Sequence, residues 1–188
     1  IINALQEETA TGDAHEGTLT STENISPTLI HQEFIKTVGI FVNETLENLV
    51  TIATEVNLDA VQLHGDEDEA FIQSLKERTN VEVWKAVQIR SAADAEAWID
   101  SSADMLLFDA YHKDERGGTG EVFDWSCLDE FERPFMLAGG IDSTNVARAI
   151  RTVRPYGIDI SSGIETEGVK DNEKIKAFTN IVRTIAMP

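Results

Sequence analysis

Residues 58–77 read LDAVQLHGDEDEAFIQSLKE, an apolar run at 58–63 followed by a helical pattern at 67–77. The run has the length of a buried strand, and the apolar residues after it recur three or four positions apart, as on one face of a helix. The same order repeats along the chain from Ser26-Pro27 onward. Continuous apolar strands that alternate with helices are typical of a parallel sheet.

Six such strand–helix units are expected. The strands are expected at 38–42, 58–63, 81–89, 105–108, 134–138 and 157–160. The helices are expected at 44–56, 67–77, 92–99, 124–130, 142–153 (with Asp142 or Ser143 as N-cap) and 172–185, with a short leading helix at 27–34. On periodicity alone, an open doubly wound α/β sheet and a closed α/β barrel are equally compatible with this pattern. The chain reads as one domain, 1–188, with 7–24 as a polar loop.

Acidic residues dominate the composition: 34 Asp and Glu stand against 15 Lys and Arg, for a net charge of −19. They are dispersed along the chain, whereas an acidic disordered tail would carry them in one block. A dispersed excess is typical of proteins from a salt-loaded cytoplasm, and it disfavours nucleic acid and anionic membranes as partners. The single cysteine, Cys127, excludes an internal disulfide framework and fits a reducing cytoplasm.

The charge excess leads to a prediction about salt. In dilute buffer the carboxylates repel one another, whereas at molar salt the Debye length of about 3 Å screens them. The melting temperature is therefore expected to rise between dilute buffer and molar KCl, as followed by circular dichroism. A melting temperature that stays flat across this range would contradict the halophilic interpretation.

Two glycine-containing loops follow the last two expected strands. Gly139-Gly140 lead into the helix at 142–153, and Ser161-Ser162-Gly163 follow the strand at 157–160. Glycine lets the backbone approach a ligand and turn its N–H groups toward it, and the loops after the final strands of a barrel commonly bind phosphate. Each loop alone could be an ordinary turn that needs glycine. On consecutive strands, the two together favour a phosphate site.

Other candidate residues lie near strand ends. Asp109 ends an apolar strand and precedes a glycine-rich loop at 117–120, so it is a candidate general acid, although a capping or turn-forming aspartate is the alternative. Gln62 and His64 alternate with apolar residues and are expected to face a barrel interior; His64 is a ligand, a base or a structural histidine. Cys127 has an apolar setting typical of a structural thiol. His15, His31 and His112 show no metal-ligand spacing, so no metal site is expected.

In order along the chain, these residues resemble the phosphoribosylanthranilate isomerase family. The matching motifs are Val38-Gly39-Ile40-Phe41-Val42-Asn43, Leu58-Asp59-Ala60-Val61-Gln62-Leu63-His64-Gly65, Leu107-Phe108-Asp109, Gly117-Gly118-Thr119-Gly120 with Phe123-Asp124-Trp125, Leu137-Ala138-Gly139-Gly140 with Asn145-Val146, and Asp159-Ile160-Ser161-Ser162-Gly163-Ile164-Glu165 with Gly168, Lys170-Asp171 and Lys174-Ile175. Six matches in register cover the chain from about residue 26 to its end. The resemblance favours the barrel over the open sheet.

The resemblance implies a (β/α)8 TIM barrel and an Amadori rearrangement of N-(5′-phosphoribosyl)anthranilate in tryptophan biosynthesis, without a cofactor. Asp109 matches the general acid, Gly139-Gly140 and Ser161-Ser162-Gly163 match the phosphate site, and Asp159 and Gln62 match residues lining the active site. The implied enzyme is a cytoplasmic isomerase, monomer or homodimer, whose partner is a small phosphosugar.

The chain also departs from the family pattern. The family's general base is a cysteine in a Lys-x-Cys-Gly motif that these 188 residues do not contain, and Cys127 lies in the wrong unit to replace it. Residues 21–27 carry no arginine for the anthranilate carboxylate, and Ile1-Ile2 resemble the end of the second strand. The chain is therefore expected to lack strand 1, helix 1 and most of strand 2. A non-catalytic phosphate-binding relic or partner subunit remains an alternative, whereas the motifs at 117–120 and 123–125 argue against another phosphosugar barrel enzyme.

Overall fold

The computed structural model describes residues 35–109 and 124–186. Of the expected features, the loop at 7–24, the helix at 27–34, the glycine-rich segment at 117–120 and the histidines at 15, 31 and 112 lie outside these residues.

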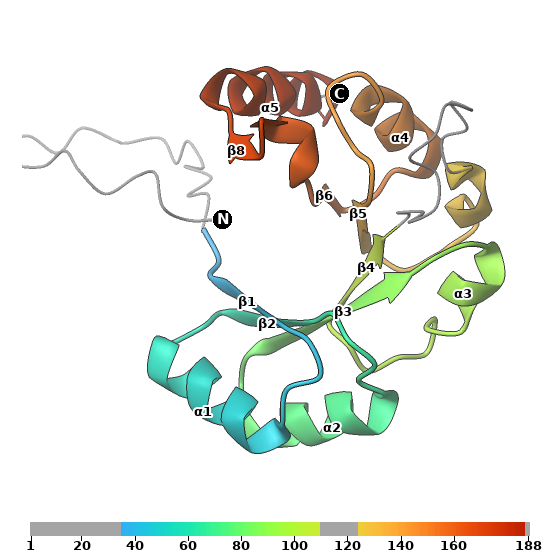
Figure 1. Cartoon of the computed structure of the whole chain (residues 1–188). Helices are drawn as coiled ribbons and strands as arrows, with labels where there is room; N and C mark the ends of the chain where they lie inside the picture. Colours follow the sequence, from blue (N-terminus) through green and yellow to red (C-terminus); the bar gives the residue numbers. More distant parts are fainter. Residues whose placement is uncertain (1–34, 110–123, 187–188) are drawn as a thin grey trace, which may run out of the picture. The chain divides into compact units, whose positions relative to one another are not determined.

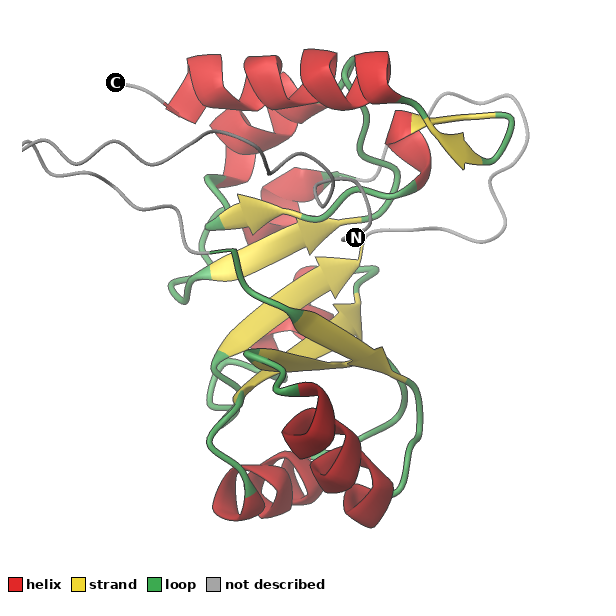
Figure 2. Cartoon of the chain, turned by 90° about the vertical axis from the view of Figure 1, so that its left-hand side faces the viewer, coloured by secondary structure: helices red, strands yellow, loops and turns green. Residues whose placement is uncertain are grey.

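Six parallel strands form one sheet within the described residues. They are β1 (Val38–Phe41), β2 (Ala60–Leu63), β3 (Glu82–Gln88), β4 (Met105–Asp109), β5 (Phe135–Ala138) and β6 (Gly157–Ile158). They lie side by side in chain order, β1-β2-β3-β4-β5-β6. A doubly wound sheet reverses its strand order at a switch point, so the strictly sequential order selects the barrel type. The sheet is curled into a half barrel with helices on its outer side (Figures 1 and 2).

Helices or helical turns follow the strands. They are α1 (Leu46–Val56), α2 (Glu69–Arg78), α3 (Ala92–Glu96), the 3-10 turn η1 (Trp125–Leu128), α4 (Val146–Val153), the 3-10 turn η2 (Ser162–Ile164) and α5 (Asn172–Ala186). The first two begin at side-chain caps, because Thr45 accepts the N–H of Asn48 and Asp68 accepts the N–H of Phe71. A small antiparallel hairpin, β7 (Glu165–Thr166) with β8 (Val169–Lys170), was not expected from the sequence.

The helix expected at 124–130 is the shorter 3-10 turn η1, and the largest differences from the expected bounds lie at two other helix ends. The fourth α-helix begins at Val146 with Asn145 as N-cap, whereas Asp142 or Ser143 was expected. The Asp142 carboxylate accepts the N–H of Thr144 at 2.7 Å and that of Asn145 at 3.2 Å, so it forms a turn that delays the helix. The third helix ends at Glu96, three residues before the expected end, because the following residues form turns with bonds between positions three apart.

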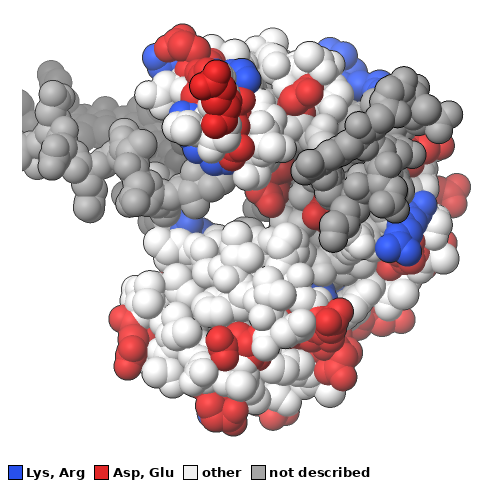
Figure 3. Space-filling model, in the orientation of Figure 1, with Lys and Arg blue, Asp and Glu red and all other residues white. Residues whose placement is uncertain are grey.

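The two faces of the sheet differ in what they contact. Outward residues such as Val83, Phe108 and Leu137 form the main core with the helices. The inner face carries a smaller cluster of Ala86, Leu107 and Ala138 with Met136. Acidic side chains are scattered over the helices and loops of the face shown in Figure 3, and basic ones are few, as the sequence indicated. Among the described residues, most charged side chains lie on the surface, and Glu67 and Lys85 are buried exceptions.

Candidate functional site

Asp109 and His64 meet in a pocket at the carboxyl ends of the strands. The pocket has a volume of about 470 Å³ and is lined by Val42, Asn43, His64, Gly65, Asp66, Ala86, Gln88 and Asp109. Asp109 is the last residue of β4 and pairs in register with Gln88 of β3 and Ala138 of β5, so these three residues share the inner face. The pocket therefore combines a carboxyl group and an imidazole, the residue types that general acid–base chemistry uses.

Gln62 lies deeper on the same face. It sits two residues before His64, is 4% exposed, and its side-chain nitrogen has no hydrogen-bond partner in the described part of the chain. A buried amide without a partner costs free energy, which is typical of functional positions. It does not line the pocket itself, so the structure brings His64, but not Gln62, to the surface that a ligand would meet.

Asp159 brings a second carboxylate toward the first. It directly follows β6 and its N–H donates to the carbonyl of Leu137 at 2.9 Å. Burial raises the pKa of Asp159, and the nearby Asp109 carboxylate raises it further. His64 and Lys170 lower the pKa of Asp159 but do not cancel the increase. His64, Asp109 and Asp159 thus interact electrostatically across the inner side of the sheet, although they come from β2, β4 and the end of β6.

The raised pKa of Asp159 gives a stability prediction. The pKa of Asp159 in the folded protein lies above the ordinary value of 3.8. The fold therefore loses stability as the pH rises from 3.8 to the folded pKa, because the carboxyl ionises more readily in the unfolded chain. Asp159→Asn removes the ionisation, so the variant is expected to melt above the wild type at pH 7, with the difference shrinking below pH 3.8. Thermal melting of both proteins across pH 3 to 8 measures this. An equal or lower melting temperature for the variant at pH 7 would show that Asp159 is well accommodated as an anion.

The two glycine-containing loops touch each other. Gly139 and Gly140 have φ of 85° and 61°, a backbone conformation that glycine adopts without strain. A Cβ added to Gly163 would lie 2.1 Å from the carbonyl oxygen of Ile141 and 3.1 Å from the Cα of Asp142. Only glycine fits this contact. The loop after β5 and the loop after β6 are therefore in direct backbone contact, and the phosphate site expected at these loops stays a prediction.

A lysine supports the second loop. The ammonium of Lys170 donates to the carbonyl of Ser161 at 2.9 Å, to its hydroxyl at 3.1 Å, and to Glu165 at 2.7 Å. It comes from β8 of the unexpected hairpin. This places a positive charge beside a loop suited to an anion.

Apart from His64 and Asp109, the residues that line the pocket were not singled out from the sequence; Asn43 and Gln88 are two of the polar ones. Both stand at or just beyond the end of an apolar strand, which was the signal available. Cys127 lies elsewhere: it lines a different pocket, of about 480 Å³, formed with residues of α3 and η1. Burial raises the pKa of the Cys127 thiol, and Asp124 raises it further, as expected of a structural thiol rather than a nucleophile.

Across residues 35–109 and 124–186, no three side chains of His, Cys, Asp or Glu come together in a way that could hold a metal ion. In the same ranges, no helix has both the length and the apolar character needed to cross a membrane.

Comparisons with known proteins agree with this geometry. Residues 2–181 match the sequence model of the family described as N-(5'phosphoribosyl)anthranilate (PRA) isomerase. The N-(5'-phosphoribosyl)anthranilate isomerase of Thermoanaerobacter sp. (strain X514) is 48% identical over 153 residues, covering 80% of this chain and 74% of that protein.

Solved structures agree as well. The crystal structure of the phosphoribosyl anthranilate isomerase from Thermotoga maritima is similar with a TM-score of 0.70 and 36% identity, over 81% of this chain and 75% of that one. Another isomerase, solved in complex with reduced 1-(o-carboxyphenylamino)-1-deoxyribulose 5-phosphate, has a TM-score of 0.67 and 35% identity over 81% and 73% of the two chains. With a family match over most of its length and relatives at this identity, the chain belongs to the phosphoribosylanthranilate isomerase family.

Proposed function

We propose that the pocket at the carboxyl ends of β1 to β4, with the loops after β5 and β6, is the active site of a phosphoribosylanthranilate isomerase of tryptophan biosynthesis. The reaction converts N-(5′-phosphoribosyl)anthranilate to 1-(2-carboxyphenylamino)-1-deoxyribulose 5-phosphate. One observation carries the proposal: Asp109 and His64 line one pocket, and on the next two strands two backbone loops come into contact. A cytoplasmic location is part of the proposal and rests on the pathway and the single cysteine.

Asp109 has the role of general acid. Its carboxyl donates a proton to the furanose ring oxygen, the C1′–O bond breaks, and the anthranilate nitrogen supplies the electron pair that forms the Schiff base. The reaction then requires a base to accept the proton from C2′, after which the enolamine tautomerises to the ketose; no base is assigned among the described residues. The Cys127 thiol lines a different pocket, so it is not assigned as this base. General acid catalysis of this kind contributes about 10²–10⁴-fold to a rate.

The loops at Gly139-Gly140 and Ser161-Ser162-Gly163 hold the substrate phosphate. Their glycines allow backbone N–H groups to approach an anion. The Lys170 ammonium donates a hydrogen bond to the carbonyl of Ser161. Such contacts fix the phosphate end, so that the ribose lies toward Asp109. Binding energy from a non-reacting phosphate is then available to orient the reacting atoms.

The direct test uses freshly generated phosphoribosylanthranilate as the substrate in molar KCl. Product formation is monitored as the loss of anthranilate fluorescence. Saturable turnover is the expected result, and it requires a base other than Cys127 to accept the C2′ proton. Binding of the reduced product analogue without turnover would instead support the alternative of a non-catalytic phosphate-binding barrel. A protein that shows neither binding nor turnover would contradict both hypotheses.

A further inference from the structure

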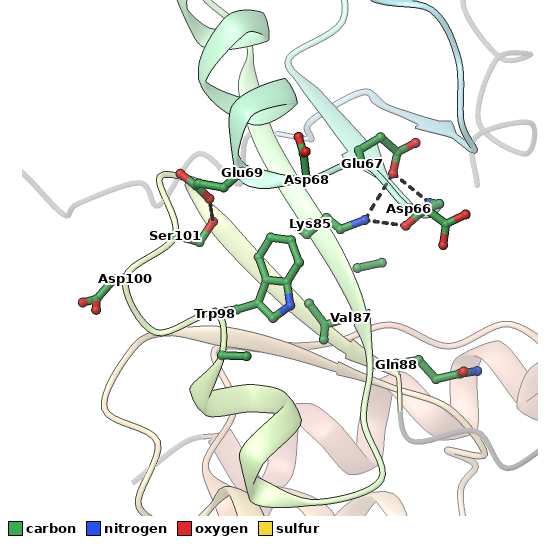
Figure 4. Close-up of a pocket in the computed structure, with 13 residues that line it drawn as sticks. Asp66, Glu67, Asp68, Glu69, Lys85, Val87, Gln88, Trp98, Asp100 and Ser101 are labelled. Atoms are coloured by element: carbon green, nitrogen blue, oxygen red, sulfur yellow. Dashed lines mark hydrogen bonds and ion pairs between the residues drawn. The ribbon is translucent and has the colours of Figure 1, made fainter.

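A buried ion pair lies just outside the pocket, on the helix side of β3. The side chains of Lys85 and Glu67 are each 3% exposed, and the ammonium lies 3.1 Å from a carboxylate oxygen. Figure 4 shows Lys85 reaching from the strand toward Glu67, with Trp98 beside it. Its neighbour Ala86 lies on the opposite face and lines the pocket with Asp109. The ion pair and the proposed active-site pocket therefore lie on opposite faces of β3.

The pair holds the backbone of two strand ends. One carboxylate oxygen of Glu67 accepts the N–H of Asn43 at 2.7 Å, and the other accepts the N–H of Gly65 at 2.9 Å. The Lys85 ammonium donates to the carbonyl of Gly65 at 2.6 Å. Asn43 follows β1 and Gly65 follows β2, and both line the active-site pocket. One carboxylate thus ties together two chain segments that carry pocket residues.

The backbone at this corner has little freedom. Asn43 has a φ of 53°, in the left-handed region that asparagine tolerates better than most residues with a side chain. A Cβ on Gly65 would lie 2.7 Å from the Asn43 nitrogen, so the two segments are in direct backbone contact. His64 is the residue before Gly65, and its N–H donates to the carbonyl of Phe41 at 2.8 Å. His64 thus lies directly between the strand end bonded to Phe41 and the Gly65 backbone held by the ion pair.

Stability alone does not account for such a pair. Burying two opposite charges in place of well-packed apolar side chains is often neutral or unfavourable for stability. The hydrogen bonds of this pair go to the rim of the pocket instead of to the helices behind it. We propose that Glu67 and Lys85 are positioning residues, which hold His64 and Asn43 where the isomerisation requires them. This inference rests on the proposed function.

Glu67→Gln is the first test. An amide has one acceptor oxygen, so one of the two N–H groups would face an NH2 group and lose its partner. kcat is expected to fall about 10- to 100-fold, as for a displacement of about 1 Å in an active site. The dissociation constant of inorganic phosphate is expected to stay unchanged, because phosphate binds at the loops after β5 and β6. A purely structural role would leave kcat per folded molecule at the wild-type value.

The double variant Glu67→Leu/Lys85→Met covers the case of a poorly folded single variant. It leaves no unpaired buried charge, so it is expected to fold better than a variant that removes one partner alone, but the strand ends lose their anchor. Its kcat is expected to remain low. A double variant that folds and turns over like the wild type would overturn the inference.

Glu69→Gln is the matched control. Glu69 is two residues further on and accepts hydrogen bonds from the Ser101 hydroxyl at 2.7 Å and the Ser102 N–H at 2.9 Å, outside the active-site pocket. Burial acts to raise its pKa, but hydrogen bonds from Ser102, Ser101 and Gln73 outweigh this and lower the pKa to about 2, so the carboxylate supports the fold. The control is expected to lower the melting temperature and leave kcat unchanged. An equal fall in kcat in this control would mean that instability, not positioning, limits the Glu67 variant.

The inference and the proposed function can fail separately. If the wild type does not turn over the substrate, the proposed function fails. The positioning role of Glu67 is then tested by comparing NMR spectra of the wild type and the Glu67→Gln variant. Faster amide exchange at Asn43 and Gly65, with shifted His64 ring resonances, supports the anchor. Unchanged exchange and unchanged resonances overturn it.

Discussion

Asp109→Asn is expected to lower kcat by about 10²–10⁴-fold, the usual contribution of a general acid. Asparagine keeps the size of the side chain but has no acidic proton to give to the ring oxygen. Because Asp109 ends β4 on the pocket side and the phosphate loops follow β5 and β6, binding of the reduced product analogue is expected to be retained. Steady-state kinetics with generated substrate and calorimetric titration with the analogue measure the two quantities.

Asp104→Asn is the control for this change. Asp104 directly precedes β4, so it lies at the opposite end of the same strand; it accepts the N–H of Val83 at 2.8 Å and pairs with Lys76. Its loss is expected to affect stability and leave kcat per folded molecule unchanged. Turnover by Asp109→Asn at the wild-type rate would remove Asp109 from the chemistry.

Gly163→Ala is expected to weaken phosphate binding about 10- to 100-fold, the range for losing one hydrogen bond to a charged group. The new methyl would lie 2.1 Å from the carbonyl oxygen of Ile141, so one of the two loops must move. Such overpacking also costs about 1–3 kcal/mol of stability. KM for the substrate and the dissociation constant of inorganic phosphate are expected to rise together, while kcat changes less.

Gly168→Ala separates binding from stability. Gly168 has a φ of 79° and no atom within 4 Å of an added Cβ, so alanine there is strained but does not clash. It is expected to lower the melting temperature without changing phosphate affinity. If Gly163→Ala binds phosphate as tightly as this control, the two loops do not form the phosphate site.

The sequence allowed most of the fold to be predicted because the strands are short, apolar and followed at once by polar or glycine residues. All six expected strands form, and those at 58–63 and 134–138 end within one residue of their expected ends. Periodicity could not distinguish a barrel from an open sheet, since both need strands buried on two faces. The order of pairing decides between them, and it is a property of contacts distant in sequence.

The candidate site was predictable where function depends on position along a strand. Asp109 ends β4 and His64 directly follows β2, and the structure brings them to one pocket. The Glu67–Lys85 pair was not predictable, since Lys85 interrupts an apolar strand and nothing local indicates that its partner lies 18 residues earlier. The start of the fourth α-helix was missed for a similar reason: the Asp142 side chain caps a turn, and Asn145 stands at the N-cap position without a side-chain bond to the helix.

A crystal structure of the full chain with the reduced product analogue bound is the most direct test. The phosphate is expected against the backbone N–H groups of the loops at Gly139-Gly140 and Ser161-Ser162-Gly163. The Asp109 carboxyl is expected within hydrogen-bonding distance of the oxygen that forms the furanose ring in the substrate. A phosphate held elsewhere, or an Asp109 side chain directed away from the sugar, would contradict the assignment of this site.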